Sequence, residues 1–155
     1  MSFRIRGLDP APFVPLYGLA DEALARRGVR RMTVDRSPGF PDRITMRDLD
    51  PGETALLLNF EHQPAASPYR SAHAIFVQEG AALRFEAVDA VPDVLRRRTL
   101  SLRAFDREGD MRDADLVEGD EAEASIQRLL GDPQTTYLHA HYAKRGCYAA
   151  LIERA

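Results

Sequence analysis

The sequence predicts an α+β fold: a single domain over residues 1–155, with a mixed or mostly antiparallel sheet of about six to eight strands and two short helices. Two observations predict it. Many short segments alternate apolar and polar residues and end at Gly, Pro or Asp turns, which is typical of strands. The 155 residues are 45% hydrophobic and contain no repeat or linker, so they supply one core.

The first part of the chain is expected to hold short strands and one helix. Phe3–Arg6 alternates as an opening strand, and three prolines then force an extended connection. Asp21 can cap a helix over Glu22–Arg27, which Gly28 would end in a left-handed conformation. Two further strands are expected, at Val29–Asp35 and Ile44–Met46.

The middle of the chain reads as a strand, a polar loop and a returning strand. Thr54–His62 begins as a continuous apolar run, which favours a strand buried on both faces. The loop Gln63–Ala72 follows, and the chain returns as a strand at His73–Val77, so a histidine stands at each end of the loop. Leu83–Phe85 is a further strand candidate, and Val91–Arg98 fits one helical turn.

A hairpin and the most strongly patterned helix come next. Thr99–Phe105 and Met111–Val117 flank a polar turn and predict two paired strands. Asp120 and Glu123 form a capping-box pair at the start of a helix that Gly131 stops. An apolar stripe at helical spacing marks the buried face of this helix: Ala122, Ile126, Leu129 and Leu130.

The C-terminal stretch Thr136–Ile152 holds two of the four histidines and the only cysteine. Its first half alternates with period two, so successive side chains point to opposite faces of a strand. One face would carry Tyr137, His139 and His141, and the other would carry Leu138, Ala140 and Tyr142.

The turn after this strand decides where Cys147 points. A three-residue turn at Lys144–Gly146 would pair His139 with Leu151 and His141 with Ala149, and would place Cys147 on the histidine face. A two-residue turn at Arg145-Gly146 would shift the pairing by one residue and place Cys147 on the opposite face. Both turns fit the sequence.

Histidine placement is the main pointer to function. Two imidazoles at i, i+2 on one strand face can reach the same ion, and a third from a neighbouring strand would complete a site for a divalent metal such as zinc. His139 and His141 supply the pair, His62 or His73 could supply the third, and Glu61 could add a carboxylate. The spacing between these segments matches no zinc signature, and paired strand histidines also occur as hydrogen-bonded or solvent-facing residues.

Three other functions fit the residues. Cys147 could act as a nucleophilic or redox thiol beside His141, although a free cysteine commonly packs as a small apolar residue. Tyr69, Arg70 and Ser71 in the polar loop could bind a small anionic ligand, or Arg70 could instead form an ion pair. A non-catalytic interaction or scaffold domain that forms a homodimer is the remaining alternative.

Composition excludes several classes of protein. The net charge of −3 argues against nucleic-acid binding, which favours a basic surface. No apolar run approaches the roughly 18 residues of a membrane span, and the first residues lack the apolar core of a signal peptide. One cysteine cannot form an internal disulfide, which predicts a cytoplasmic protein.

Four motifs carry a resemblance to a known family: P-G-F-P-D-R, L-L-L-N-F-E-H-Q-P, P-Y-R-S-A-H-A-I-F-V and H-A-H-Y-A-K-R-G-C-Y. Through them the whole chain resembles DUF1203, a bacterial family of short proteins with no assigned activity. The resemblance implies one domain in a bacterial cytoplasm and no catalytic residues. Relatives tend to have P-C-R where this chain has Pro41-Asp42-Arg43, so a paired-thiol role would be lost here.

Overall fold

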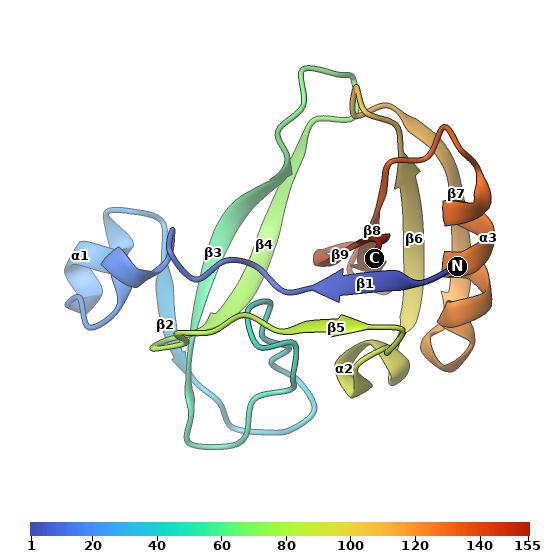
Figure 1. Cartoon of the computed structure of the whole chain (residues 1–155). Coiled ribbons are helices and arrows are strands. Elements are labelled where there is room, and N and C mark those ends of the chain that lie inside the picture. Colours follow the sequence, from blue (N-terminus) through green and yellow to red (C-terminus); the bar gives the residue numbers. More distant parts are fainter.

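Nine strands form two antiparallel sheets in the computed structural model, which describes residues 1–155 (Figure 1). Six strands pair in the order β5-β1-β9-β8-β6-β7, and three in the order β2-β3-β4. The larger sheet consists of β1 (Phe3–Arg6), β5 (Glu86–Val88), β6 (Thr99–Phe105), β7 (Met111–Glu118), β8 (Tyr137–Tyr142) and β9 (Tyr148–Arg154). The smaller consists of β2 (Arg30–Thr33), β3 (Thr54–Gln63) and β4 (Ser71–Gln78).

The helices are few and short. The α-helices are α1 (Asp21–Ala25), α2 (Asp93–Arg96) and α3 (Ala122–Gly131), and the 3-10 helices are η1 (Val14–Leu16) and η2 (Gly119–Glu121). None of them is long and apolar enough to cross a bilayer. The fold is α+β in a single domain, as predicted, but its strands divide between two sheets instead of forming one.

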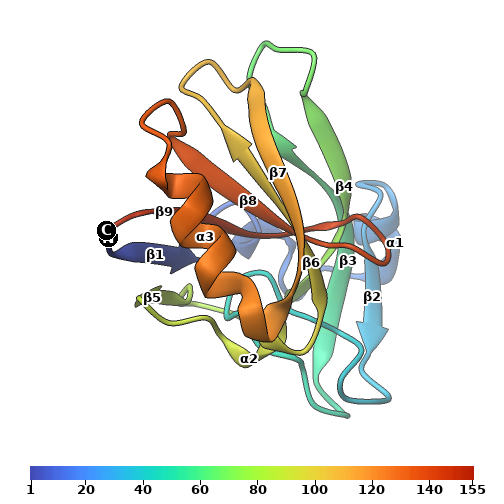
Figure 2. The same ribbon diagram turned by 90° about the vertical axis from the view of Figure 1, so that its right-hand side faces the viewer.

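The six-stranded sheet buries one face against α3 (Figure 2). The apolar stripe predicted for this helix is buried, and it packs on alternate residues of the sheet such as Leu102, Leu138 and Ala140. Because neighbouring residues in a strand point to opposite faces, the histidines of β8 point away from α3. The expected two-faced strand is confirmed, and its polar face lies on the side of the three-stranded sheet (Figure 1).

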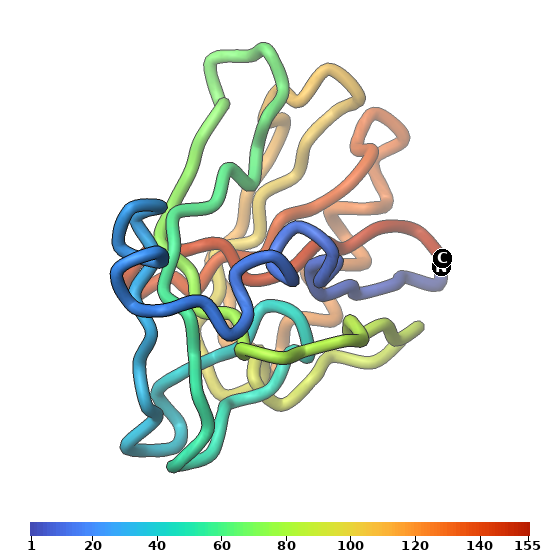
Figure 3. Tube along the Cα trace, turned by 90° about the vertical axis from the view of Figure 1, so that its left-hand side faces the viewer, coloured from blue at the N-terminus to red at the C-terminus, as the bar shows by residue number.

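The three-stranded sheet is a long β3–β4 hairpin with β2 along one edge. A second apolar cluster lies between this hairpin and the N-terminal segment from η1 to α1, which crosses in front of it in Figure 3. Phe13 and Leu24 from that segment pack there with Leu56 and Ile75 of the hairpin. At its closed end the hairpin meets the β6–β7 turn, where the Ser67 Oγ donates to the Gly109 carbonyl oxygen at 2.9 Å.

The expected strand at Ile44–Met46 is wrong, because this segment is a buried turn. Met46 has a φ of 53°, which ends any extended run. The Asp42 carboxylate, fully buried, accepts hydrogen bonds from the amides of Ile44, Thr45 and Gln78. These bonds fix the turn against β4.

Several other boundaries differ from the prediction: β2 is shorter than the expected Val29–Asp35, and β4 begins two residues before the expected His73. Leu83–Phe85 is not a strand; the chain pairs with β1 only from Glu86, since the Phe85 amide bonds to the Ile44 carbonyl of the buried turn. The Asp120/Glu123 capping box does not form, because residues 119–121 wind as η2 before α3 begins. The helix expected over Glu22–Arg27 is shorter and has no side-chain cap from Asp21, although Gly28 has the predicted left-handed backbone.

Candidate metal centre

The candidate site lies between the two sheets and begins with β8. His139 pairs with Arg103 of β6, and His141 pairs with Ser101. Both histidines point away from α3 and are almost fully buried, at 5% and 1% exposure. Burial on this face therefore comes from the three-stranded sheet and from the Tyr148 ring of β9, which meets the ring of His139 edge-on at 5.1 Å.

A bulge in β9 separates Cys147 from the histidines. His139 pairs with Leu151 as predicted, but the register then shifts and His141 pairs with Tyr148 instead of Ala149. The connecting turn has four residues, 143–146, and the Tyr142 amide bonds to the Cys147 carbonyl across it. Since one residue of register exchanges the two faces, Tyr148 replaces the thiol beside the histidines.

Cys147 instead packs with the core on the α3 side of the sheet. Its Sγ accepts a hydrogen bond at 3.1 Å from the Nη2 of the buried Arg43. The predicted thiol–imidazole pair with His141 is therefore wrong, because the bulge places the two side chains on opposite faces of the hairpin.

His62 reaches the site through a second bulge. On β3, Glu61 pairs with Ala72 and Gln63 pairs with Ser71, so His62 is the extra residue between them. A bulge lets consecutive residues point to the same side. His62 consequently stacks on Tyr148 with ring centroids 5.3 Å apart, while Gln63 Nε2 donates to the Tyr137 hydroxyl at 2.8 Å.

The three histidines converge. One nitrogen of each ring, from His62, His139 and His141, lies within 4.8 Å of the other two. In a tetrahedral zinc site with bonds near 2.1 Å, such nitrogens would be about 3.4 Å apart, so binding would draw them together by up to about 1.4 Å. Each ring also has a buried nitrogen without a hydrogen-bond partner: Nδ1 of His62, Nδ1 of His139 and Nε2 of His141.

Two of the rings are oriented through their other nitrogen. His141 Nδ1 lies 2.9 Å from the Gly146 carbonyl oxygen, to which only a protonated nitrogen can donate, so Nε2 keeps its lone pair. His62 Nε2 lies 3.4 Å from the Ser71 hydroxyl. A metal-bound histidine characteristically holds its second nitrogen in this way.

The electrostatics keep these rings neutral. Desolvation by burial lowers the pKa of His139 and of His141 to about 3 and that of His62 to about 4, and the charge of Arg103 lowers each further. Arg103 forms no ion pair; its Nε donates to the Ser101 hydroxyl at 3.3 Å. Because a neutral imidazole is the form that binds a metal, the rings are ready ligands at pH 7.

The other candidates for the metal site lie elsewhere. His73 is half-buried on β4, with its Nδ1 3.2 Å from its neighbour's carbonyl oxygen, and is not part of the group of three. Glu61 pairs with Arg70 at 3.1 Å on the surface and contributes no carboxylate. The bulge explains the difference, since it turns His62 inward while Glu61 stays exposed.

The loop residues expected to bind an anion do not form a site together. Arg70 is neutralised by Glu61, and the Tyr69 ring, 42% exposed, lies against Phe105 at 6.5 Å. Ser71 lies instead beside His62. The three side chains therefore face different partners, and Ser71 belongs with the histidines.

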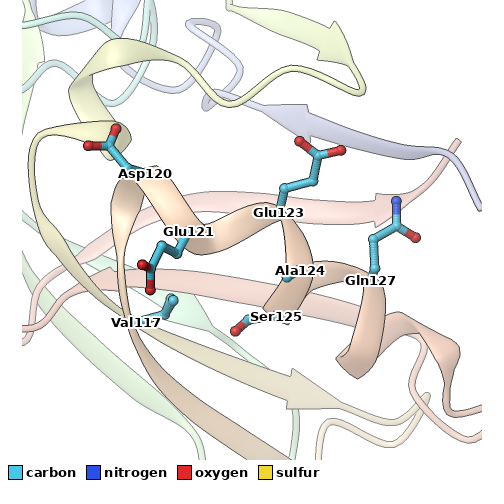
Figure 4. Close-up of a pocket in the computed structure, with 7 residues that line it drawn as sticks. All are labelled: Val117, Asp120, Glu121, Glu123, Ala124, Ser125 and Gln127. Carbon is cyan, nitrogen blue, oxygen red and sulfur yellow. The ribbon is translucent and has the colours of Figure 1, made fainter.

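A hollow at the start of α3 offers no alternative site. Figure 4 shows the carboxylates of Asp120, Glu121 and Glu123 pointing in different directions around it.

Sequence reasoning missed two residues beside the histidine cluster. The Tyr148 ring contacts the rings of all three histidines, and the charge of Arg103 lowers their pKa values. Alternation places Ser101 and Arg103 on one face of their strand, but only the β6–β8 pairing brings that face beside the histidines. Nothing local in the sequence revealed that Tyr148 faces them.

Fold and site define an α+β single-domain protein with a buried histidine triad that could hold a metal. The sequence model of the family described as "Protein of unknown function (DUF1203)" matches residues 39–154, and the chain belongs to this family. The match includes all three histidines and leaves out β1, α1 and β2. No curated protein and no solved structure matches the chain.

Proposed function

We propose that His62, His139 and His141 bind one divalent metal ion, with zinc as the first choice. The observation that supports this is the convergence of three neutral rings, each with a buried nitrogen that has no partner. An unsatisfied buried polar atom costs about 1–3 kcal/mol, so three ring nitrogens without hydrogen-bond partners are destabilising. A metal ion that accepts all three lone pairs offsets that cost.

The donor set indicates the type of centre. Structural zinc sites have four protein ligands, whereas catalytic sites have three and leave a position for water or substrate. No cysteine or carboxylate joins the three histidines. Three histidines alone would leave a position for water or substrate on a bound ion, and the nearby positive charge of Arg103 would favour a water-derived hydroxide or another anion there.

Metal analysis of untagged protein tests this proposal. After incubation with zinc and desalting, elemental analysis is expected to find about one equivalent per chain. Replacing His139 with Ala, or His62 with Ala, should reduce the bound metal to background. His62→Ala is the safer variant because that ring is only half-buried, so its loss disturbs the core less than the loss of His139.

His73→Ala is the matched control, since His73 lies on the strand next to His62 but outside the cluster. It should bind zinc as the unmodified protein does. Cobalt gives a second measurement, because a tetrahedral nitrogen site produces visible absorption bands. The proposal is refuted if the folded protein takes up no metal, or if His62→Ala and His73→Ala bind equally well.

A further inference from the structure

A second site, distinct from the histidine cluster, is a pocket of about 550 Å³ between the β8–β9 turn, the residues that follow α2, the segment 36–43 and the β3–β4 hairpin. Its lining contains six basic side chains and no carboxylate, although the whole chain has a net charge of −3. The six are Arg36, Arg43, Arg97, Arg98, Lys144 and Arg145. Such a concentration of one charge sign in a cleft attracts anions.

Nearby carboxylates neutralise only part of this charge. Arg97 and Arg98 share a single carboxylate, Asp48, at 3.3 and 2.6 Å. Arg36 pairs with its exposed neighbour Asp35. The remaining three basic groups, Arg43, Lys144 and Arg145, form no ion pair. The pocket therefore keeps a net positive charge of several units.

Arg43 is the most unusual of these groups because it is buried at 1% exposure without a carboxylate partner. Its guanidinium donates to the carbonyl oxygens of Tyr148 and Pro41 and to the Cys147 sulfur. These partners satisfy its hydrogen bonds but do not cancel its charge. A buried cation without a counter-ion is unfavourable, so an anion in the pocket would stabilise it.

Tyr142 gives an independent indication of a ligand. Its side chain lines the pocket at 5% exposure, and its hydroxyl is buried without a hydrogen-bond partner. The Arg43 and Arg98 guanidinium carbons each lie 5.0 Å from the centre of its ring. Burial raises the pKa of this hydroxyl to about 12, so it remains a proton donor at neutral pH. The hydroxyl can therefore donate a hydrogen bond to an acceptor atom of a ligand.

The geometry points to a phosphate-bearing small molecule with an apolar part as the ligand of this pocket. Arginine forks match the paired oxygens of a phosphate, and the Tyr142 hydroxyl supplies a further donor. Pro41, Leu57 and Phe76 form an apolar wall in the same pocket. The volume of about 550 Å³ lies within the usual range for small-ligand sites.

Calorimetric titration in phosphate-free buffer of low ionic strength tests this inference. The two probes are inorganic phosphate and phenyl phosphate, which present the same anionic group with and without an apolar part. Phenyl phosphate is expected to bind more tightly, by about tenfold, because its ring reaches the apolar wall. Absence of binding by both probes would overturn the inference, and equal binding of the two would overturn the apolar part of it.

Two double variants separate a site from general electrostatic attraction. Lys144→Ala with Arg145→Ala removes two exposed charges of the pocket, and Arg26→Ala with Arg27→Ala removes two exposed charges that do not line it. The first pair should weaken phenyl phosphate binding at least tenfold, and the second should leave it unchanged. Equal weakening by both pairs would overturn the inference.

Tyr142→Phe tests the unpartnered hydroxyl. This variant removes one atom from a buried side chain, so the fold should be preserved, and circular dichroism checks this. Phenyl phosphate binding is expected to weaken roughly tenfold, because a hydrogen bond to a charged acceptor is lost. Undiminished binding would exclude the hydroxyl from the site. Because zinc uptake does not involve these residues, this site and the metal centre can fail independently.

Discussion

The buried histidines predict that the metal-free protein loses stability as the pH falls from 7 to 5. His139 and His141 are almost fully buried, and their pKa values are lowered to about 3. In the unfolded chain the pKa of histidine is about 6.5. The unfolded state therefore takes up protons in a range where the folded state does not, so the free energy of unfolding decreases with falling pH.

The magnitude follows from these pKa values. At pH 5 the unfolded state gains about 2 kcal/mol of stability from each histidine relative to pH 7, and the folded state gains almost nothing. His139 and His141 together should therefore lower the free energy of unfolding by roughly 4 kcal/mol. His62 adds a smaller amount because it is partly exposed to solvent. The loss is fully developed only near the folded pKa of about 3.

Urea denaturation followed by circular dichroism, with chelator present, measures this effect at the two pH values. The matched variant is His139→Gln, which has no titrating group at this position. Its free energy of unfolding should fall by about 2 kcal/mol less between pH 7 and pH 5 than that of the unmodified protein. Glu53 and Glu79 form ion pairs that lower their pKa values. Their contribution to the free energy of unfolding is therefore lost mainly below pH 5, outside the range of the measurement. Identical pH dependence in both proteins would refute the reasoning.

Three further predictions concern single side chains. Asp42→Ala leaves the backbone amides that donate to this carboxylate without an acceptor. Urea denaturation should show the free energy of unfolding lowered by about 3 kcal/mol or more, and a loss below about 1 kcal/mol would contradict this. Gly7→Ala would place a Cβ 2.1 Å from the Ile44 carbonyl oxygen and should lower the melting temperature, whereas Gly131→Ala, with open space around it, should not. Ser71→Ala should weaken zinc binding about tenfold without changing stoichiometry, and unchanged affinity would show that Ser71 does not orient His62.

Local patterns in the sequence were sufficient for much of the fold. The β6–β7 hairpin was predicted within a residue, and the buried stripe of α3 was predicted correctly. The alternation over Tyr137–Tyr142 correctly placed His139 and His141 on one face. These features depend on periods of two or 3.6 residues, which are properties of the chain itself. The division into two sheets could not be read in this way, since strand pairing joins residues far apart in sequence.

The sequence by itself determined that His139 and His141 share a strand face, and it offered His62 and His73 as candidates for a third ligand. Only the tertiary structure decided which one completes the cluster. A bulge turns His62 inward, and a second bulge brings Tyr148 to the histidines in place of Cys147. A bulge is set by the partner strand and by the packing around it, so the same residues in isolation fit either register.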